Sequence, residues 1–585
     1  MNFFKIMFAS MLGTLLTIFI LMVVSIGIIA GIIAAASTPV ETVSSNTVLQ
    51  LTLDNTILDR EPGMPLFVDI TGPEKINGLT DIIRNIKKAK QDDNIKGIYL
   101  DLTDIPAGIT TVSEIREALL DFKSSGKFIY AYSNMLSQKA YYLATAADKI
   151  YLNPEGAILF KGINSELMFI KGTLEKVGIK VQVIRHGKFK AATEPFFLDK
   201  MSPENRKQIT ELITDVWDQM LLGISESRGV SKTDLNNLAD SLKISSAEDA
   251  YQNRLIDSTI YMDQFLTILR SKLGITDKAQ IKTITLEKYM NVPAKDKSGT
   301  AKDKIAVIYA QGNVIDGEGD DQSIGGDRFA KAIRKAREDK KVKAIVLRVN
   351  SPGGSALASE IVLREVLLAD QEKPVIASFG DVAASGGYYI ACGARKILAE
   401  PTTLTGSIGV WAAIPNMQGL LTNKLGITFD NAMTNKNSDF ISVNKPLPPY
   451  QTAVIQKEIE NVYDVFVGHV SKGRNMNKAA VDSIGQGRIW SGTDAKAIGL
   501  VDEMGGLTKA IEVAADLAGT KDYRAVALPE KKDPFRQIME DYFGAGVQIS
   551  IKQELGDDYR YYEFLKEVRG IRGIQARLPF EITIE

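Results

Sequence analysis

The first motif in this sequence that could do chemistry is Ser-Gly-Gly at residues 385–387, between an apolar run and the pattern of an apolar helix. A strand–turn–helix of this kind would present the Ser385 hydroxyl at a helix start, where backbone N–H groups are free. A second motif, Ser-Pro-Gly-Gly at residues 351–354, also follows an apolar run. Because Gly354 and Gly386 lack a Cβ, their amides could approach a substrate carbonyl closely and form an oxyanion hole. Either motif alone could be only a tight turn, but together they predict acyl transfer with Ser385 as the nucleophile.

A serine nucleophile needs a base, and the sequence offers two kinds. The only histidines are His186 and His469, and His469 lies in a stretch with the pattern of a packed amphipathic helix, which favours a structural role. A lysine can act instead if burial lowers its pKa from about 10.4. The stretch GKFKAATEPF, at residues 187–196, contains Lys188 and Lys190 among apolar neighbours. Spacing alone favours solvated lysines here and does not choose between the two.

Composition limits the other chemistries. The 585 residues include 70 basic and 71 acidic side chains, and this balance gives no support for nucleic-acid binding. The single cysteine, Cys392, excludes an intrachain disulfide and any cysteine-rich zinc or iron–sulfur site. Two histidines are too few for most metal sites, so we expect neither a metal nor another cofactor.

The N-terminus has the composition of a membrane-spanning helix. After Lys5 the sequence carries no charge for about thirty residues, whereas about 20 apolar residues suffice to cross a bilayer. A signal peptide usually has a shorter apolar core, so we expect an uncleaved transmembrane anchor at residues 1–40, although Ala-Ala-Ala-Ser near residue 34 leaves cleavage open. Lys5 favours an N-terminus inside the cell, which would put everything after the anchor outside the cytoplasm.

The rest of the chain contains one unit twice. The stretch IKGIYLDLTD, which begins at Ile95, matches VKAIVLRVNS, which begins at Val342. Farther along, YYLATAADKIYLNP from Tyr141 matches YYIACGARKILAEP from Tyr388, at the same separation in the sequence. Repetition at a constant offset indicates a duplicated domain, and a lysine-rich stretch with the composition of a linker separates the copies.

Each repeat alternates short apolar runs with amphipathic stretches. In the second repeat, KIAVIYA, KAIVLRV and KPVIASF are typical of buried strands, and SALASEIVLREVLLAD is typical of a helix that begins near Ser355 or Ser359. Strands interleaved with helices predict an α/β fold with a largely parallel sheet. The predicted parts are an anchor at residues 1–40, an N-terminal repeat with the lysine at 41–290 and a linker at 291–304. A C-terminal repeat with the serine follows at 305–520, and a C-terminal extension at 521–585.

The two repeats differ where chemistry is expected. Gln-Lys-Ala at residues 138–140 stands where the second repeat has Ser-Gly-Gly, and the glycine pair of the second repeat has no counterpart in the first. Phe160 occupies the position of Ser407, which lies in the loop Thr-Gly-Ser-Ile-Gly. Residues that serve only the shared fold should occur in both copies, so the special loops of the second copy indicate function.

These stretches resemble the signal peptide peptidase A family of the long, duplicated type, also called protease IV. The resemblance is carried by GKFKAATEPF, VNSPGGSALASE, DVAASGGYYIACGA and EPTTLTGSIGV, which together with the N-terminal span cover most of residues 1–510. It implies tandem domains with the crotonase-like fold of Clp-type proteases. It also implies a Ser/Lys dyad divided between the domains, with Ser385 as nucleophile and Lys190 as base, and Ser407 as an auxiliary hydroxyl that positions the lysine amine.

The same resemblance implies a substrate and a setting. Members of this family are serine endopeptidases that degrade remnant signal peptides in or at the membrane after preprotein processing, and other unfolded peptides. The resemblance implies a homotetramer on the inner membrane, with a single-pass anchor and the catalytic body on the periplasmic side. Two rival functions stay open. The first is a crotonase-type acyl-CoA hydratase or isomerase, which has a similar oxyanion hole for thioesters, and the second is a non-catalytic scaffold.

Overall fold

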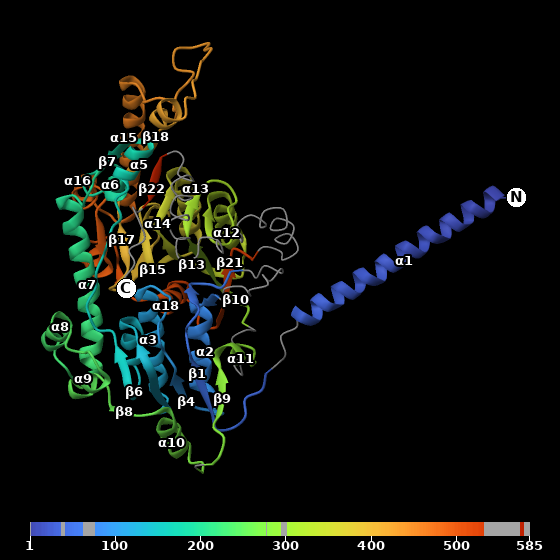
Figure 1. Cartoon of the computed structure of the whole chain (residues 1–585), viewed down its shortest axis with the longest axis vertical. Helices are drawn as coiled ribbons and strands as arrows, with labels where there is room; N and C mark the ends of the chain where they lie inside the picture. The colour runs from blue at the N-terminus through green and yellow to red at the C-terminus, as the bar shows by residue number, and fades with distance from the viewer. Residues whose placement is uncertain are drawn as a thin grey trace.

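The computed structural model describes residues 2–36, 41–62, 76–276, 278–293, 301–531 and 574–577. Helix α1 (Asn2–Ala36) projects away from the rest of the molecule (Figure 1). Its segment Phe3–Val24 has a mean hydropathy of 2.4 and is exposed throughout. By length and composition this helix could cross a membrane, which agrees with the expected anchor, although a signal sequence would pass the same test.

A parallel sheet with the strand order β8-β6-β5-β4-β1-β9 forms the core of the first repeat. One face packs against α2 and α3, and side chains of the other face, such as Val48 and Tyr99, pack with Phe265 of α10. Burial on both faces explains why the apolar residues of strands such as β1 and β4 do not alternate strictly with polar ones. The strands are β1 (Thr47–Leu51), β4 (Ile95–Leu100), β5 (Phe128–Leu136), β6 (Lys149–Ile158), β8 (Ser258–Thr259) and β9 (Lys282–Thr285).

The first repeat contains α7, which is the longest described helix apart from α1. This helix, α7, begins after Ser202, whose side chain accepts from the Asn205 N–H, and ends at Gly229 in the left-handed region. Ser202 followed by Pro203 is the common order of an N-cap and a first helical residue. The helices are α2 (Leu79–Gln91), α3 (Ile109–Lys123), α4 (Gln138–Ala144), α5 (Lys171–Val177), α6 (Glu194–Phe197), α7 (Pro203–Arg228), α8 (Lys232–Asp240), α9 (Ala247–Gln252), α10 (Met262–Leu273) and α11 (Leu286–Met290).

A second sheet has the strand order β19-β17-β15-β13-β10-β21, with β16 beside β15 and β20 beside β16. Its strands pair in parallel except β17 with β19. The sheet includes β21, which comes from the predicted C-terminal extension. The strands are β10 (Asp303–Gln311), β13 (Val342–Ser351), β15 (Val375–Ala384), β16 (Lys396–Ala399), β17 (Leu404–Gly406), β19 (Ile489–Ser491), β20 (Glu503–Met504) and β21 (Tyr523–Leu528).

The helices of the second repeat follow the sequence expectation. Helix α13 begins directly after Ser355, whose hydroxyl accepts from the Ala358 N–H and so acts as its N-cap. The helices are α12 (Gly326–Glu338), α13 (Ala356–Glu372), α14 (Gly386–Ala391), α15 (Pro449–Gly473), α16 (Lys478–Ile484), α17 (Gly492–Ala497) and α18 (Leu507–Leu517).

The duplication is visible in the topology. Strands β1, β4 and β5 pair in the same parallel order as β10, β13 and β15, and the helices α2 and α3 have α12 and α13 as their counterparts along the chain. In Figure 1 the two units lie one above the other, with α7 running along the side of both. The predicted duplicated α/β fold is confirmed.

A third sheet joins the repeats, with the strand order β12-β11-β14-β22-β18-β7. Strand β7 comes from the first repeat and pairs antiparallel with β18 of the second. The strands are β7 (Lys180–His186), β11 (Asn313–Ile315), β12 (Ser323–Gly325), β14 (Gly353–Ser355), β18 (Val410–Asn416) and β22 (Gln575–Arg577), and a separate pair consists of β2 (Thr56–Leu58) and β3 (Ile76–Gly78).

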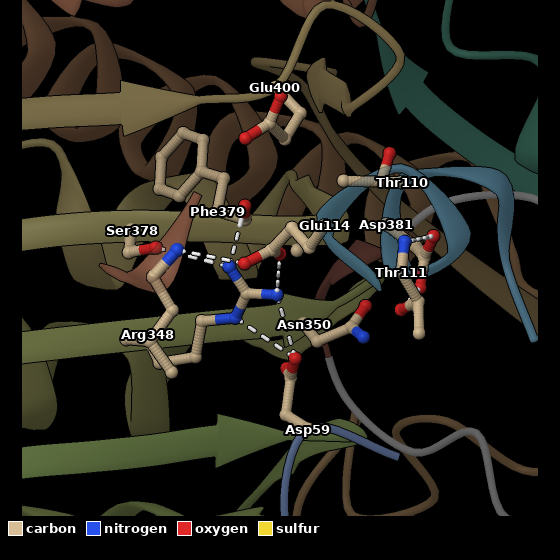
Figure 2. A network of polar contacts seen from close by, with 12 residues as sticks. Asp59, Thr110, Thr111, Glu114, Arg348, Asn350, Ser378, Phe379, Asp381 and Glu400 are labelled. Atoms are coloured by element: carbon tan, nitrogen blue, oxygen red, sulfur yellow. Dashed lines mark hydrogen bonds and ion pairs between the residues drawn. The ribbon is translucent and has the colours of Figure 1, made fainter. Parts of the chain in front are cut away.

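A buried polar network also links the repeats (Figure 2). Nε and Nη2 of Arg348, on β13, lie 2.9 and 2.8 Å from Oδ1 of Asp59, and Nη2 lies 2.5 Å from Oε1 of Glu114. Close by, Asp381 accepts from the N–H and the hydroxyl of Thr111. These contacts fix the relative position of the two units, which matters because the candidate site lies between them.

Candidate active site

Ser385 lies at the sharp turn between β15 and α14, as the sequence predicts. Its φ of 55° and ψ of −115° are rare for a residue with a side chain, and its N–H donates to the carbonyl oxygen of Gly406 at 2.8 Å. The residue is fully buried. Backbone strain at a buried serine that begins a helix is typical of a catalytic nucleophile, because the strained turn fixes the orientation of the hydroxyl.

Lys190 reaches this serine from the first repeat. The antiparallel register of β7 and β18 ends with His186 opposite Val410, so the chain that follows β7 lies beside the loop at residues 407–409. Nζ of Lys190 lies 2.8 Å from Oγ of Ser385. The pairing of one strand from each repeat therefore brings the two side chains together.

The surroundings of Lys190 favour an uncharged amine. The residue is 0% exposed, and burial lowers its pKa well below the ordinary lysine value. Among the described residues, no carboxylate pairs with it. Lys188, only two residues away, is exposed, with Nζ over the Phe189 ring. The two lysines that spacing alone could not separate thus have opposite environments, and Lys190, which the family resemblance implied as the base, is the buried one.

Ser407 completes a three-residue cluster. Its Oγ lies 2.9 Å from Nζ of Lys190, and Nζ also donates to its carbonyl oxygen at 3.2 Å. Ser407 is 1% exposed and its N–H donates to the Arg488 carbonyl at 2.7 Å. These contacts hold the amine in line with Oγ of Ser385.

Two glycines make room for the lysine, of which Gly409 belongs to the loop Thr-Gly-Ser-Ile-Gly and Gly487 was missed by the sequence reasoning. A Cβ on Gly487 would lie 2.6 Å from Cβ of Lys190, and one on Gly409 would lie 3.2 Å from its Cδ. Gly487 also has a φ of +80°, which favours glycine. Glycines at residues 485 and 487 are a sequence signal, but one that says nothing about which distant side chain they contact.

The two glycine loops meet beside Ser385. A Cβ on Gly353 would lie 2.6 Å from the Gly386 N, and one on Gly386 would lie 3.0 Å from the Gly354 N. Gly353 has a φ of +99°, and its N–H donates to Oγ of Ser351 at 3.1 Å. The amides of Gly354 and Gly386 therefore lie close together, as two donors to one oxyanion would have to.

The histidines lie elsewhere. Nδ1 of His186 is 2.5 Å from Oε2 of Glu460, and its ring stacks on Tyr463. Nε2 of His469 lies 3.0 Å from Oε2 of Glu360. Within the described residues, neither ring contacts Ser385 or Lys190, and no cluster of His, Cys, Asp or Glu could hold a metal ion.

One family model and several known proteases match this chain. The model of peptidase family S49 matches residues 121–276 and again residues 368–521. Protease 4 of Haemophilus influenzae is 37% identical over 471 residues, which is 78% of this chain and 75% of that protein. The chloroplastic serine protease SPPA of Arabidopsis thaliana is 33% identical, over 86% of this chain and 74% of that protein. Among solved structures, a mutant ClpP1 from Listeria monocytogenes matches with 14% identity and a TM-score of 0.25, over 35% of this chain and 94% of that one.

Proposed function

The chain belongs to peptidase family S49, and we propose that it is a serine endopeptidase in which Ser385 is the nucleophile and Lys190 the general base. The observation that supports this dyad most strongly is the distance of 2.8 Å between Nζ and Oγ, within a fully buried site. A buried amine whose pKa is lowered can accept the serine proton near neutral pH, as histidine does in the commoner arrangement.

The proposed reaction has two halves. Neutral Lys190 accepts the proton of Ser385 as Oγ attacks the carbonyl carbon of a peptide bond, while the amides of Gly354 and Gly386 bind the developing oxyanion. Lys190 then donates this proton to the nitrogen of the cleaved peptide bond, which leaves as the free amine of the first product. Water then gives its proton to Lys190 and attacks the acyl-enzyme, which releases the carboxylate product and the Ser385 hydroxyl. Ser407 keeps Nζ of Lys190 in position throughout both halves.

The finer parts of the proposal concern substrate and setting. We propose that α1 anchors the chain in the inner membrane as a single-pass helix with the body on the periplasmic side, and that the substrates are remnant signal peptides and other unfolded peptides. The exposed apolar face of α1 supports the anchor. A homotetramer is part of the same proposal, as is the division into an N-terminal repeat, a C-terminal repeat and an extension at the predicted boundaries.

Labelling with a fluorophosphonate and hydrolysis of a fluorogenic peptide test the dyad. We expect label on the native protein and on Lys188→Ala, no label on Ser385→Ala, and a loss of about 100- to 10,000-fold in kcat for Lys190→Ala, the usual range for a general base. Lys188→Ala is the matched control because this exposed lysine lies two residues from the proposed base. Normal turnover in Lys190→Ala would reject the dyad, and an unlabelled native protein that hydrates or isomerises acyl-CoA would favour the crotonase-type reaction.

A further inference from the structure

Gln208 lies between the two halves of the proposed dyad. It belongs to α7, the helix that runs along both repeats (Figure 1), and it is 1% exposed. Its Nε2 donates to the carbonyl oxygen of Phe189 at 3.2 Å, and its Oε1 accepts from the N–H of Ile489, also at 3.2 Å. One buried amide therefore joins the backbone next to Lys190 to strand β19 of the second repeat.

Both peptide bonds that Gln208 contacts adjoin the candidate site. One of them leads directly into Lys190. The other joins Arg488 to Ile489, and the carbonyl oxygen of this second bond accepts from the Ser407 N–H at 2.7 Å. The same side chain thus contacts the backbone of the proposed base and the backbone that holds the hydroxyl beside its amine.

Strand β19 also leads to the nucleophile. Ile489 is opposite Gly406 in the antiparallel pair of β19 and β17, and the Gly406 carbonyl oxygen accepts from the Ser385 N–H at 2.8 Å. The distance between Lys190 and Ser385 therefore depends on how the lysine segment sits against β19. A displacement of about 1 Å between reacting groups can cost roughly 100-fold in rate.

The orientation of this amide is fixed by its partners. A backbone N–H can only donate and a carbonyl oxygen can only accept, so Oε1 must face Ile489 and Nε2 must face Phe189. Nε2 also donates to Oδ1 of Asn205 at 3.1 Å, and Nδ2 of Asn205 donates to Oε2 of Glu194 at 2.9 Å. Glu194 is 0% exposed and also accepts from the N–H and the hydroxyl of Ser202. These buried hydrogen bonds hold the amide in the orientation that serves both repeats.

The second repeat has a different residue at the matching position. The stretch DVWD at residues 215–218 matches NVYD at residues 461–464, and the same offset places Val454 opposite Gln208. Val454, on α15, is exposed and carries no polar group. A residue that served only the shared fold should occur in both copies, so Gln208 belongs with the features that distinguish them.

We propose that Gln208 is a positioning residue of the dyad, which holds the backbone of Lys190 at a fixed distance from the strands that carry Ser385 and Ser407. This inference rests on the proposed Ser/Lys peptidase function and adds a residue that acts through the lysine without touching the substrate.

Other contacts hold α7 on β19 without this amide. Leu212, one turn farther along the helix, packs in one cluster with Ile489. Asp215 accepts from the hydroxyl of Ser491 at 2.6 Å. Loss of the Gln208 amide should therefore leave the helix in place and release mainly the lysine segment.

Gln208→Met tests this role in the full chain, because it keeps the length of the side chain and removes its hydrogen bonds. We expect kcat for a fluorogenic peptide to fall about 100-fold with an unchanged KM, since the lysine is displaced but the glycine amides are not. Burial lowers the pKa of Lys190, so a lysine that is no longer held in the buried site should titrate closer to about 10.4. The pH at which inactivation by a fluorophosphonate reaches its plateau should therefore rise.

Gln138→Met is the matched control. Gln138 is a second buried glutamine of the first repeat, 4% exposed, and its Nε2 donates to the Gly162 carbonyl at 3.1 Å. Its Oε1 accepts from the N–H groups of Lys161 and Gly162 at 3.1 and 3.0 Å. These contacts hold a loop of the first repeat that carries no residue of the candidate site, so this variant should lose similar stability but keep the native kcat and pH profile.

A second variant, Gln208→Asn, covers the case in which Gln208→Met fails to fold. It keeps a neutral amide but is one methylene shorter, so it cannot reach both peptide bonds. We expect kcat to fall about tenfold, the equivalent of one hydrogen bond, with the pH profile shifted in the same direction. Thermal unfolding followed by circular dichroism identifies any general loss of the fold.

Three results would overturn the inference and leave the dyad standing. They are an unchanged kcat in a folded Gln208 variant, a fall in kcat without a shift of the pH profile, and an equal effect of Gln138→Met. Failure of the peptidase function would be recognised separately, as a native protein that takes no fluorophosphonate or as normal turnover in Lys190→Ala.

Discussion

Replacing Arg348 by Met should destabilise the chain more than any surface ion-pair change, because this guanidinium neutralises two buried carboxylates at once. Arg348 is 0% exposed and its partners Asp59 and Glu114 are 1% and 4% exposed. Besides the two carboxylates, its Nη1 donates to Oγ of Ser378 and to the carbonyl of Phe379, both at 3.1 Å (Figure 2). Removal of one partner of a buried pair costs about 3–5 kcal/mol, since the other charge stays buried without compensation.

Urea unfolding of the full chain in detergent, followed by circular dichroism, would measure this loss. A matched control is Arg84→Ala, which removes an ion pair to Asp81 in which the arginine side chain is 69% exposed, and should cost less than about 1 kcal/mol. The triple change Arg348→Met, Asp59→Asn and Glu114→Gln should regain most of the stability, because no buried charge is left unpaired. A loss for Arg348→Met as small as that of the control would refute the conclusion that this network fixes the two repeats together.

Three further predictions concern the site and its surroundings. Ser407→Ala removes the hydroxyl 2.9 Å from Nζ of Lys190 and should lower kcat about tenfold in a peptidase assay, the equivalent of one hydrogen bond of about 1.4 kcal/mol, with an unchanged Tm. Gly487→Ala should lower kcat about 100-fold because its Cβ would displace the lysine, whereas Gly126→Ala, with a similar φ of +77° but open space around it, should retain full activity. Burial and the neighbouring Glu117 and Glu114 raise the pKa of Glu400 to about 8, whereas its value in the unfolded chain is about 4.3. Because the folded state binds this proton more tightly, the free energy of unfolding falls as pH rises from about 4.3 to about 8. Glu400→Gln should therefore flatten the dependence of the unfolding free energy on pH and be more stable than the native chain at pH 8, and an unchanged slope would contradict the shift.

The fold was predictable because its signals are local or repeated. Buried strands such as Val342–Ser351 contain short apolar runs without strict alternation, and similar runs recur in the first repeat at a constant offset. Ser385 was predictable for a related reason, since a turn between a strand and a helix that needs two glycines leaves a mark within a few residues. Comparison of the repeats then separated the special loops from the shared scaffold.

The contacts between distant segments were not predictable from local pattern. Lys188 and Lys190 are equivalent by spacing, and only the family resemblance pointed to Lys190. Their environments differ because β7 pairs with β18, which lies more than two hundred residues farther along the chain (Figure 1). Arg348 looked like one more residue of a buried strand, because its partners Asp59 and Glu114 belong to the other repeat. Strand β22 has no pattern of its own and exists as a strand because two edges in need of a partner lie on either side of it.

The most direct test of the central claim is the pH dependence of the rate at which a fluorophosphonate inactivates the protein, measured in the native chain and in Lys190→Ala. Since burial lowers the pKa of Lys190, the neutral amine should be the dominant form well below pH 10, and the native rate should fall only when pH drops through that lowered pKa. We predict that the native rate reaches its plateau well below the ordinary lysine pKa, and that Lys190→Ala reacts much more slowly and without this titration. A native profile that keeps rising to about pH 10.4, the ordinary lysine value, or equal rates in the two proteins, would contradict the dyad.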